Sequence, residues 1–289
     1  MKSNKHIDTL VAMALREDIG SGDVTTETFV PKDVTKKARI VARERGILCG
    51  CEVIRIIGKL IDKRIRVKLL KYDGMHIKNR DIIGTLQGPV YSILKAERVI
   101  LNYIGYLSGI STTTSSYVKK IKGTRAKIFD TRKTTPAYRT LEKYAVTIGG
   151  GYNHRKGLYD QVLIKDNHFK AIEKNSVKDL ACLIQNVRKK IPRRMKIEIE
   201  ADSLMLLRKI LPLHPDIILL DNMRGQTLKK ALAMVNGERK RSKVKIAVEA
   251  SGGINLRNVR QIAQLGVERV SIGAVTHSAR SLDFSLEVI

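Results

Sequence analysis

From about Thr124 onward, short apolar runs alternate with stretches whose apolar residues recur at the spacing of an amphipathic helix. Parallel strands need a crossover between them, so this alternation predicts a parallel sheet with helices packed outside it. The chain contains six such strand–helix units. They are AKIFD with a helix at about 141–148, QVLIKD with 176–190, KIEIE with 203–211, DIILLD with 225–235, KIAVEA with 256–265, and RVSIGA with a helix from Ser278 onward.

Six units suit a closed or nearly closed α/β barrel, although eight is the usual number. A doubly wound open sheet is the alternative. Hydrophobic periodicity alone does not distinguish the two architectures.

The first hundred or so residues show a different pattern, which predicts a separate α+β domain bridged to the rest by a long helix. Helices are expected near 6–16, at 53–61 and from 91 to about 119, with strand-like ARIVARERGILCG, IRVKLLKYDG and DIIGTLQG between them. We place the amino-terminal domain at 1–118 and the catalytic barrel domain at 119–275. The tail at about 276–289 is able to pack back on the first domain.

Charged or glycine residues stand at the carboxyl end of every strand predicted in the second half. Ligands bind at this edge in both barrels and open α/β sheets. Helix caps explain one or two such positions but not all of them. The residues are Asp130, Arg132 and Lys133; Lys165, Asp166, Asn167 and His168; Glu198 and Glu200; Asp221 and Asn222; Glu249 and Ser251 to Gly253; and Gly273 and Ala274. We therefore expect a ligand site there.

The segment 130–168 combines clustered cations with three consecutive glycines. A solvated helix would explain the cations but not the glycines, each of which costs roughly 1 kcal/mol against Ala in a helix interior. Arginine forks match carboxylate and phosphate oxygens, and lysine supplies a movable charge. The residues are Arg132, Lys133, Arg139, His154, Arg155 and Lys165, interleaved with Gly149 to Gly151. This combination predicts a pocket for a small molecule carrying several negative charges.

Glu200 and Asp221 end consecutive predicted strands, so their carboxylates can converge. Hard oxygens of this kind suit Mg²⁺, held directly or through water. Glu198 shares a strand face with Glu200, and glycines after the last two strands suit a phosphate bound by backbone N–H groups. The chain has no Walker A, GxGxxG after a strand, HExxH or GxSxG, which argues against the common nucleotide, zinc-protease and serine-hydrolase designs.

A net charge of +27 is the unusual feature of an otherwise ordinary globular composition. It indicates anionic ligands or nucleic acid on one side, or a lysine-rich proteome and solubility on the other. Aromatic residues make up only 4% and Trp is absent, so base-stacking platforms are poorly supplied. We find no zinc-finger spacing and no aromatic RNA-binding motif. The sequence therefore gives nucleic acid little support as a partner.

Cysteine spacing and the amino terminus favour a cytoplasmic protein. Cys49, Cys51 and Cys182 lack the second pair that a tetrahedral metal site needs, so we expect reduced thiols. The first residues lack the apolar core of a signal peptide, and no apolar run approaches the ~20 residues needed to span a bilayer. We expect no association with a membrane.

These motifs together resemble the quinolinate phosphoribosyltransferase family. The matching blocks are EDIGSGDVTT, ERVILNYIGYLSGIST, DTRKTTPAYR, GGGYNHRKGLYD, LIKDNH, EIEADSL, ILLDN, EASGGI and SIGAVTHSA. They follow the family's order over nearly the whole chain, and DTRKT, NHR and KDNH together are highly specific. One departure is Ala137, where the family usually has glycine.

The resemblance implies a type II phosphoribosyltransferase-like fold, with an amino-terminal α/β sandwich domain followed by an incomplete α/β barrel, assembled as a homodimer. The implied reaction joins quinolinate to phosphoribosyl pyrophosphate and yields nicotinate mononucleotide, pyrophosphate and CO₂ in de novo NAD biosynthesis. It uses Mg²⁺ and no organic cofactor.

The resemblance also implies roles for individual residues. Quinolinate is implied to bind Arg98, Arg132, His154, Arg155 and Lys165, with Arg98 contributed in trans. The implied catalytic residues are Lys133, beside the sugar and pyrophosphate, and Glu200 and Asp221, at the ribose and Mg²⁺. The implied 5′-phosphate loops contain Ser251, Gly252, Gly253, Gly273 and Ala274.

The sequence leaves two rival functions open. The nearest is a related phosphoribosyltransferase acting on another acidic heterocycle, such as the molybdenum-locus relatives, which typically lack the KDNH block. The other is a nucleic-acid-binding protein, which salt-sensitive retention of DNA without activity on quinolinate would favour.

Overall fold

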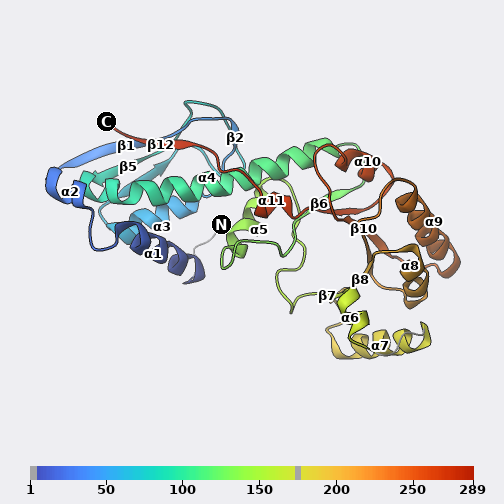
Figure 1. The fold of residues 1–289 in the computed structure, drawn as a ribbon. Helices are drawn as coiled ribbons and strands as arrows, with labels where there is room; N and C mark the ends of the chain where they lie inside the picture. Colours follow the sequence, from blue (N-terminus) through green and yellow to red (C-terminus); the bar gives the residue numbers. More distant parts are fainter. Residues whose placement is uncertain (1–4, 173–176) are drawn as a thin grey trace. The chain divides into compact units, whose positions relative to one another are not determined.

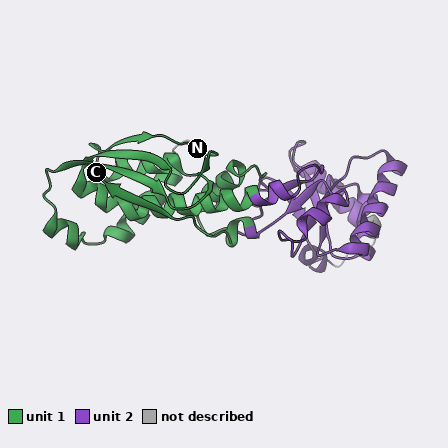
Figure 2. Cartoon of the chain, turned by 90° about the horizontal axis from the view of Figure 1, so that it is seen from above, with its two compact units in different colours: residues 1–115, 134–151, 275–289 green, residues 116–133, 152–274 purple. Residues whose placement is uncertain are grey.

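The computed structural model describes residues 5–172 and 177–289, which form two compact units (Figure 2). Unit 1 contains the chain up to residue 115 together with 134–151 and 275–289, and unit 2 contains 116–133 and 152–274. The first break lies close to the predicted boundary at 118. Residues 134–151, which the prediction placed in the barrel domain, group with unit 1 because Gly149 and Gly151 press against Ser111 and Thr114.

Unit 1 is built on a four-stranded antiparallel sheet in the order β12-β1-β5-β3. The strands are β1 (Thr35–Ala42), β3 (Arg66–Leu69), β5 (Ile82–Pro89) and β12 (Phe284–Val288), and a second, two-stranded sheet pairs β2 (Gly46–Ile47) with β4 (His76–Ile77). The helices are α1 (Lys5–Ile19), α2 (Val24–Phe29), α3 (Cys51–Ile61), α4 (Val90–Lys120), which continues into unit 2, and α5 (Arg139–Ile148). Helices α1, α3 and α4 cover one face of the four-stranded sheet (Figure 1).

The core of unit 1 follows from apolar residues at helical spacing along α4. Ile93, Ala96, Ile100, Ile104 and Leu107 recur every three or four residues and are buried. A stripe of this kind points to one side of a helix and packs on the sheet. No helix in the described ranges combines the length and apolarity needed to cross a membrane.

The carboxy-terminal tail forms a strand, so the helix predicted from Ser278 onward is wrong. The last helix, α11 (Ala274–His277), ends before Ser278, and β12 then pairs with β1 in the sheet of unit 1. Gly105 and Gly109 of α4 make room for this return, because a Cβ at either position would clash with the carbonyl oxygen of Leu282 or Arg280. Without side chains there, the tail backbone lies directly against the helix.

Unit 2 contains the predicted parallel sheet with helices around it (Figure 1). Its strands are β6 (Lys127–Phe129), β7 (Val162–Ile164), β8 (Ile197–Ala201), β9 (Ile217–Asp221), β10 (Ala247–Ser251) and β11 (Arg269–Ser271). Its helices are α6 (Asp166–Lys170), α7 (Val177–Lys190), α8 (Leu204–Ile210), the short 3₁₀ helix Leu211–Leu213, α9 (Gly225–Ser242) and α10 (Val259–Gln264). Ser176, the predicted start of the helix now seen as α7, lies outside the described residues.

Strand order decides between the two architectures left open by the sequence. The order is β6-β11-β10-β9-β8-β7, with parallel pairing throughout. Each strand from β7 to β11 lies beside the next, and β6, the first strand of the unit, lies beside the last. In a doubly wound sheet, the order of the strands would instead reverse at a switch point within the sheet. Unit 2 is therefore an incomplete α/β barrel, with β6 and β7 as its two edge strands.

Candidate active site

The carboxyl ends of the parallel strands bring most of the predicted site residues to one edge of unit 2. Arg132 and Lys133 follow β6, Lys165 follows β7, Glu200 lies near the end of β8, Asp221 and Ser251 end β9 and β10, and Gly273 and Ala274 follow β11. The exceptions are Arg98, which lies exposed on α4 in unit 1, and His154, which is buried inside the barrel.

Arg132 and Arg155 both belong to unit 2, and the charge of one acts on the other. Burial lowers the pKa of Arg155, and the positive charge of Arg132 lowers it further, against the opposing effect of Glu198 and Asp160. Arg155 is partly buried and donates from Nη1 to the carbonyl oxygen of Gln161 at 3.3 Å. Like charges held together lower the cost of binding a dianion between them, because the ligand relieves their repulsion.

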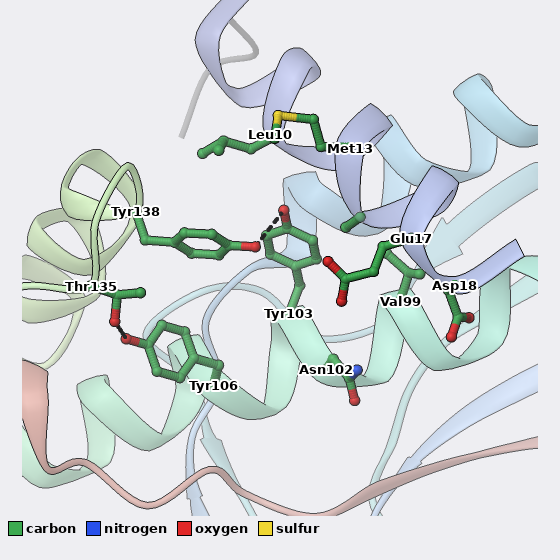
Figure 3. Close-up of a pocket in the computed structure, with 11 residues that line it drawn as sticks. Leu10, Met13, Glu17, Asp18, Val99, Asn102, Tyr103, Tyr106, Thr135 and Tyr138 are labelled. Carbon is green, nitrogen blue, oxygen red and sulfur yellow. Dashed lines mark hydrogen bonds between the residues drawn. The ribbon is translucent and has the colours of Figure 1, made fainter. Parts of the chain in front are cut away.

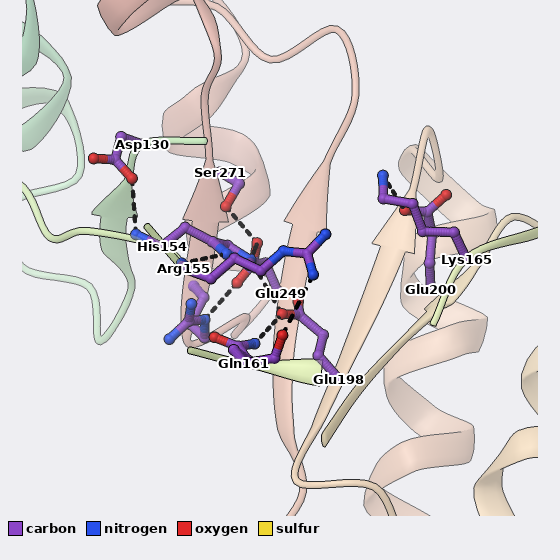
Figure 4. Close-up of polar contacts among 10 residues, drawn as sticks. Asp130, His154, Arg155, Gln161, Lys165, Glu198, Glu200, Glu249 and Ser271 are labelled. Atoms are coloured by element: carbon purple, nitrogen blue, oxygen red, sulfur yellow. Dashed lines mark hydrogen bonds and ion pairs between the residues drawn. The ribbon is translucent and has the colours of Figure 1, made fainter. Parts of the chain in front are cut away.

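Lys165 and Glu200 form an ion pair with 3.1 Å between Nζ and Oε2 (Figure 4). The Glu200 side chain is more buried, at 15% exposure against 45% for Lys165. Lys165 is held in extended conformation before α6, where its backbone N–H donates to Nδ1 of His168 at 2.9 Å. The structure thus joins a predicted quinolinate ligand to a predicted metal ligand.

The loop after β10 requires its glycines. Gly252 and Gly253 have φ of +89° and +56°, in the left-handed region. A Cβ on Gly252 would clash with the side chain of Asn222, and one on Gly253 with Arg224. The loop is further fixed because the Asn222 N–H donates to the carbonyl oxygen of Ser251 at 2.9 Å. Such a backbone can approach an anion closely.

His154 lies inside the barrel. It is 8% exposed, and its Nε2 lies 3.0 Å from Oε2 of Glu198 and 3.4 Å from Oε1 of Glu249 (Figure 4). Burial lowers the pKa of His154, but hydrogen bonds to the two glutamates outweigh it and raise that pKa to about 9. The N–H of Arg155 points at Nδ1 from 2.7 Å, which favours the neutral ring instead. Nε2 carries a hydrogen in either state, so it donates to the glutamates in both.

The carboxylates around His154 belong to a buried polar network that the sequence reasoning did not identify. Glu249 accepts from Arg269 and Ser271, and Glu198 accepts from Gln161 at 2.5 Å. Burial raises the pKa of Glu198, and the charge of Glu249 raises it further; for Glu249, His154 and Arg269 outweigh burial and lower the pKa. The sequence contains one sign of this network: glutamates interrupt the apolar runs KIEIE and KIAVEA. Barrel interiors are usually apolar, so a charge within such a strand is unusual.

His154, Glu198 and Glu249 could hold a metal ion by distance alone, because their ligand atoms lie within 4.8 Å of one another. The chemistry of the surroundings disfavours this. Arg269 and Ser271 already occupy the oxygens of Glu249, and a guanidinium beside the site repels a cation. We interpret the group as an ion-pair network.

A separate pocket of about 410 Å³ lies in unit 1, between α1, α4 and residues 135–138 (Figure 3). Tyr106 donates to Glu142 and lies 2.9 Å from the hydroxyl oxygen of Thr135, and Glu142 also accepts from the Thr135 N–H at 3.0 Å. These contacts fix the chain two residues after Lys133. Ala137, the departure from the family pattern, has φ of +66°, and its carbonyl oxygen lies 3.0 Å from Nε2 of His6. Glycine reaches this conformation at lower cost.

Two family models together cover most of the chain. The one described as the quinolinate phosphoribosyl transferase C-terminal domain matches residues 110–287, and the N-terminal domain of the same family matches 23–108. The two matches meet near residue 109, before the first break between the units at 115, and the C-terminal match includes residues 134–151 and 275–287, which group with unit 1.

Individual relatives give the same assignment. The chain is 39% identical over 272 residues to the probable nicotinate-nucleotide pyrophosphorylase [carboxylating] of Bacillus subtilis (strain 168), covering 94% of this chain and 90% of that protein. It is 37% identical over 284 residues to the nicotinate-nucleotide pyrophosphorylase [carboxylating] of Mycobacterium leprae, covering 96% and 95%. The solved structure of the nicotinate-nucleotide pyrophosphorylase from Francisella tularensis superposes with a TM-score of 0.89 at 36% identity, covering 100% of this chain and 98% of that one. Fold, motif order and full-length similarity agree: the chain belongs to the quinolinate phosphoribosyltransferase family.

Proposed function

We propose that the protein transfers the phosphoribosyl group of phosphoribosyl pyrophosphate to quinolinate, with loss of one carboxylate as CO₂. The products are nicotinate mononucleotide and pyrophosphate, and the reaction belongs to de novo NAD biosynthesis. Full-length similarity to enzymes named nicotinate-nucleotide pyrophosphorylase [carboxylating] supports this activity.

The observation that carries the proposal is the set of cations at the strand ends of unit 2: Arg132 follows β6, Lys165 follows β7, and Arg155 lies in the segment that leads into β7. Quinolinate has two adjacent carboxylates, and two guanidinium forks can each bind one of them with paired hydrogen bonds. Such a clamp holds the ring so that its nitrogen faces the ribose carbon that it attacks. Lys165 adds a third positive charge at the same edge of the sheet.

The acidic residues suit the other substrate. Departure of pyrophosphate leaves positive charge on the ribose, which nearby carboxylates of Glu200 and Asp221 would stabilise. Lys133 follows β6 and would offset the negative charge that develops on the leaving pyrophosphate. The glycine backbone at 252 and 253, together with Gly273 and Ala274, would receive the 5′-phosphate.

The same carboxylates fit Mg²⁺ by their chemistry. Glu200 and Asp221 are hard oxygen donors, near the end of β8 and at the end of β9, and both are partly exposed. We propose that they hold the ion directly or through water, and that it neutralises charge on the leaving pyrophosphate. Lys165 already pairs with Glu200, so this lysine would have to share that carboxylate or turn to quinolinate.

We further propose a homodimer in which Arg98 acts in trans. Arg98 is exposed on α4, in the unit that does not contain the other quinolinate ligands. A two-fold dimer could place it at the partner's barrel and create two equivalent sites.

We also propose a cytoplasmic location, because Cys49, Cys51 and Cys182 are free thiols.

The test is an ultraviolet assay of quinolinate consumption, with phosphoribosyl pyrophosphate and Mg²⁺ each omitted in turn. The proposal predicts loss of the quinolinate absorbance, matched by nicotinate mononucleotide, only when the complete mixture is present. Failure to consume quinolinate, together with salt-sensitive retention of DNA, would instead assign the protein to the nucleic-acid-binding class.

A further inference from the structure

We propose that Glu198 and Gln161 are positioning residues for quinolinate: they hold the segment 152–161 and, through it, the guanidinium of Arg155. This inference rests on the proposed function. It assigns a role to a buried carboxylate that neither the clamp nor the ribose chemistry uses.

The segment 152–161 connects the two edge strands of the incomplete barrel. It is hydrogen-bonded to the end of β6 and leads into β7. Its first part is tied to β6, because the Tyr152 N–H donates to Ile128 O at 2.8 Å and the Asp130 N–H donates to Tyr152 O at 3.0 Å. The His154 N–H donates to the Asp130 carboxylate at 2.8 Å. After Gln161 the chain enters β7. Strand pairing therefore fixes the start of the segment but not the part around Arg155.

Glu198 supplies the missing anchor from β8. A single oxygen, Oε2, accepts from Nε2 of His154 at 3.0 Å and from Nε2 of Gln161 at 2.5 Å (Figure 4). One carboxylate thus joins the residue just before Arg155 to the last residue of the segment.

Arg155 is bonded to both residues that Glu198 holds. Its backbone N–H points at Nδ1 of His154 from 2.7 Å, and its guanidinium donates to the carbonyl oxygen of Gln161 at 3.3 Å. Displacement of either neighbour would therefore move the backbone or the side chain of Arg155. A shift of about 1 Å in a substrate-orienting group is enough to cost activity.

Stability alone is a poor reason for a charge at this position. Glu198 is fully buried, and its Oε1 has no hydrogen-bond partner among the described residues. Replacing a buried ion pair by apolar residues of similar size is often neutral or stabilising, and barrel interiors are usually filled with Val, Ile and Leu. Its role in holding the segment 152–161 explains the buried carboxylate of Glu198 better than a contribution to folding stability does.

The test compares Glu198→Leu and Gln161→Leu with wild type in steady-state kinetics for both substrates. Each variant should raise KM for quinolinate about tenfold, the effect of losing a charge-assisted hydrogen bond, while KM for phosphoribosyl pyrophosphate changes less than twofold. Glu198→Gln keeps an acceptor oxygen and should lie much nearer wild type. In an Arg155→Ala background, Glu198→Leu should add less than twofold, because its effect passes through Arg155.

The matched control is Glu238→Leu, since Glu238 is also buried and also pairs with a histidine, His214 at 2.9 Å, but on the outer helix α9. It should lower the melting temperature without changing KM for quinolinate. Unchanged quinolinate KM in Gln161→Leu, which alters a partly exposed side chain, overturns the inference even if Glu198→Leu does not fold. A wild-type protein inactive on quinolinate would overturn the proposed function itself, which separates the two failures.

Discussion

Arg132 and Lys133 come shortly after β6 and Lys165 comes directly after β7, whereas Arg155 lies in the segment before β7. The local pattern was therefore enough to place Arg132, Lys133 and Lys165 at the strand ends, but it did not place Arg155. The partners of His154 could not be found this way. Glu198 and Glu249 come from β8 and β10, which are not neighbours in the sheet, and only the curvature of the barrel brings both to one imidazole.

At this scale, Arg132→Lys keeps the charge and removes the planar fork. The loss of one charge-assisted hydrogen bond is worth about 1.5–3 kcal/mol, so kcat/KM for quinolinate should fall by roughly one to two orders of magnitude. Steady-state kinetics measure this. Arg188→Lys, an exposed change on α7, is the control and should leave kcat/KM unaltered. Equal behaviour of the two variants would make Arg132 a surface cation.

The pH dependence of stability can be predicted at Glu238. Hydrogen bonds from Ser242, Arg241 and His214 lower its pKa to about 2, against an ordinary 4.5. A lowered carboxyl pKa stabilises the fold above about pH 4.5, and this contribution is lost as pH falls toward 2. Glu238→Gln should therefore destabilise the protein more at pH 6 than at pH 3, as measured by melting temperature. A difference that stays constant over this range would refute the assignment.

Among the elements, periodicity predicted the six strands of unit 2, most strands of unit 1 and most of the helices. The short helices α2, α6 and α11 were missed, because none of them is long enough to show an apolar period. Strand β12 was mistaken for a helix. Its partner, β1, begins about 250 residues earlier in the chain, so no local pattern indicates the pairing.

Gly105 and Gly109 in α4 leave room for the returning tail. This role can be tested by comparing one of them with a glycine in another helix. Gly109→Ala would place a Cβ against the carbonyl oxygen of Arg280, and overpacking of this kind typically costs about 1–3 kcal/mol. Gly237→Ala in α9 is the matched control, because its Cβ would have nothing within 4 Å and helix propensity favours alanine by about 1 kcal/mol. Urea unfolding should show opposite signs for the two. Stabilisation by both changes would mean that the tail does not lie against α4.

For the whole molecule, the sequence predicted two domains and an incomplete barrel but left the strand order open, because order is set by contacts between distant segments. The proposed assembly is likewise a property of the whole molecule, since it makes each pocket depend on two chains.

Complementation tests that assembly. Arg98→Ala and Lys165→Ala chains should each be inactive alone. If Arg98 acts in trans, a mixed dimer has one site with both defects and one with neither. Random mixing should then restore about a quarter of wild-type activity, because half the dimers are mixed and half of their sites are intact. A mixture that exchanges subunits, shown by native mass spectrometry, and yet stays inactive would place Arg98 in its own subunit or outside the site.

The central claim is that the strand ends of unit 2 bind both carboxylates of quinolinate. The most direct measurement is the ratio of kcat/KM for quinolinate to kcat/KM for nicotinate, with phosphoribosyl pyrophosphate and Mg²⁺ held saturating. Nicotinate lacks one carboxylate and leaves a clamp cation unpaired in a partly buried site, so the ratio should exceed about 10⁴. Comparable kcat/KM values for the two acids would contradict the account.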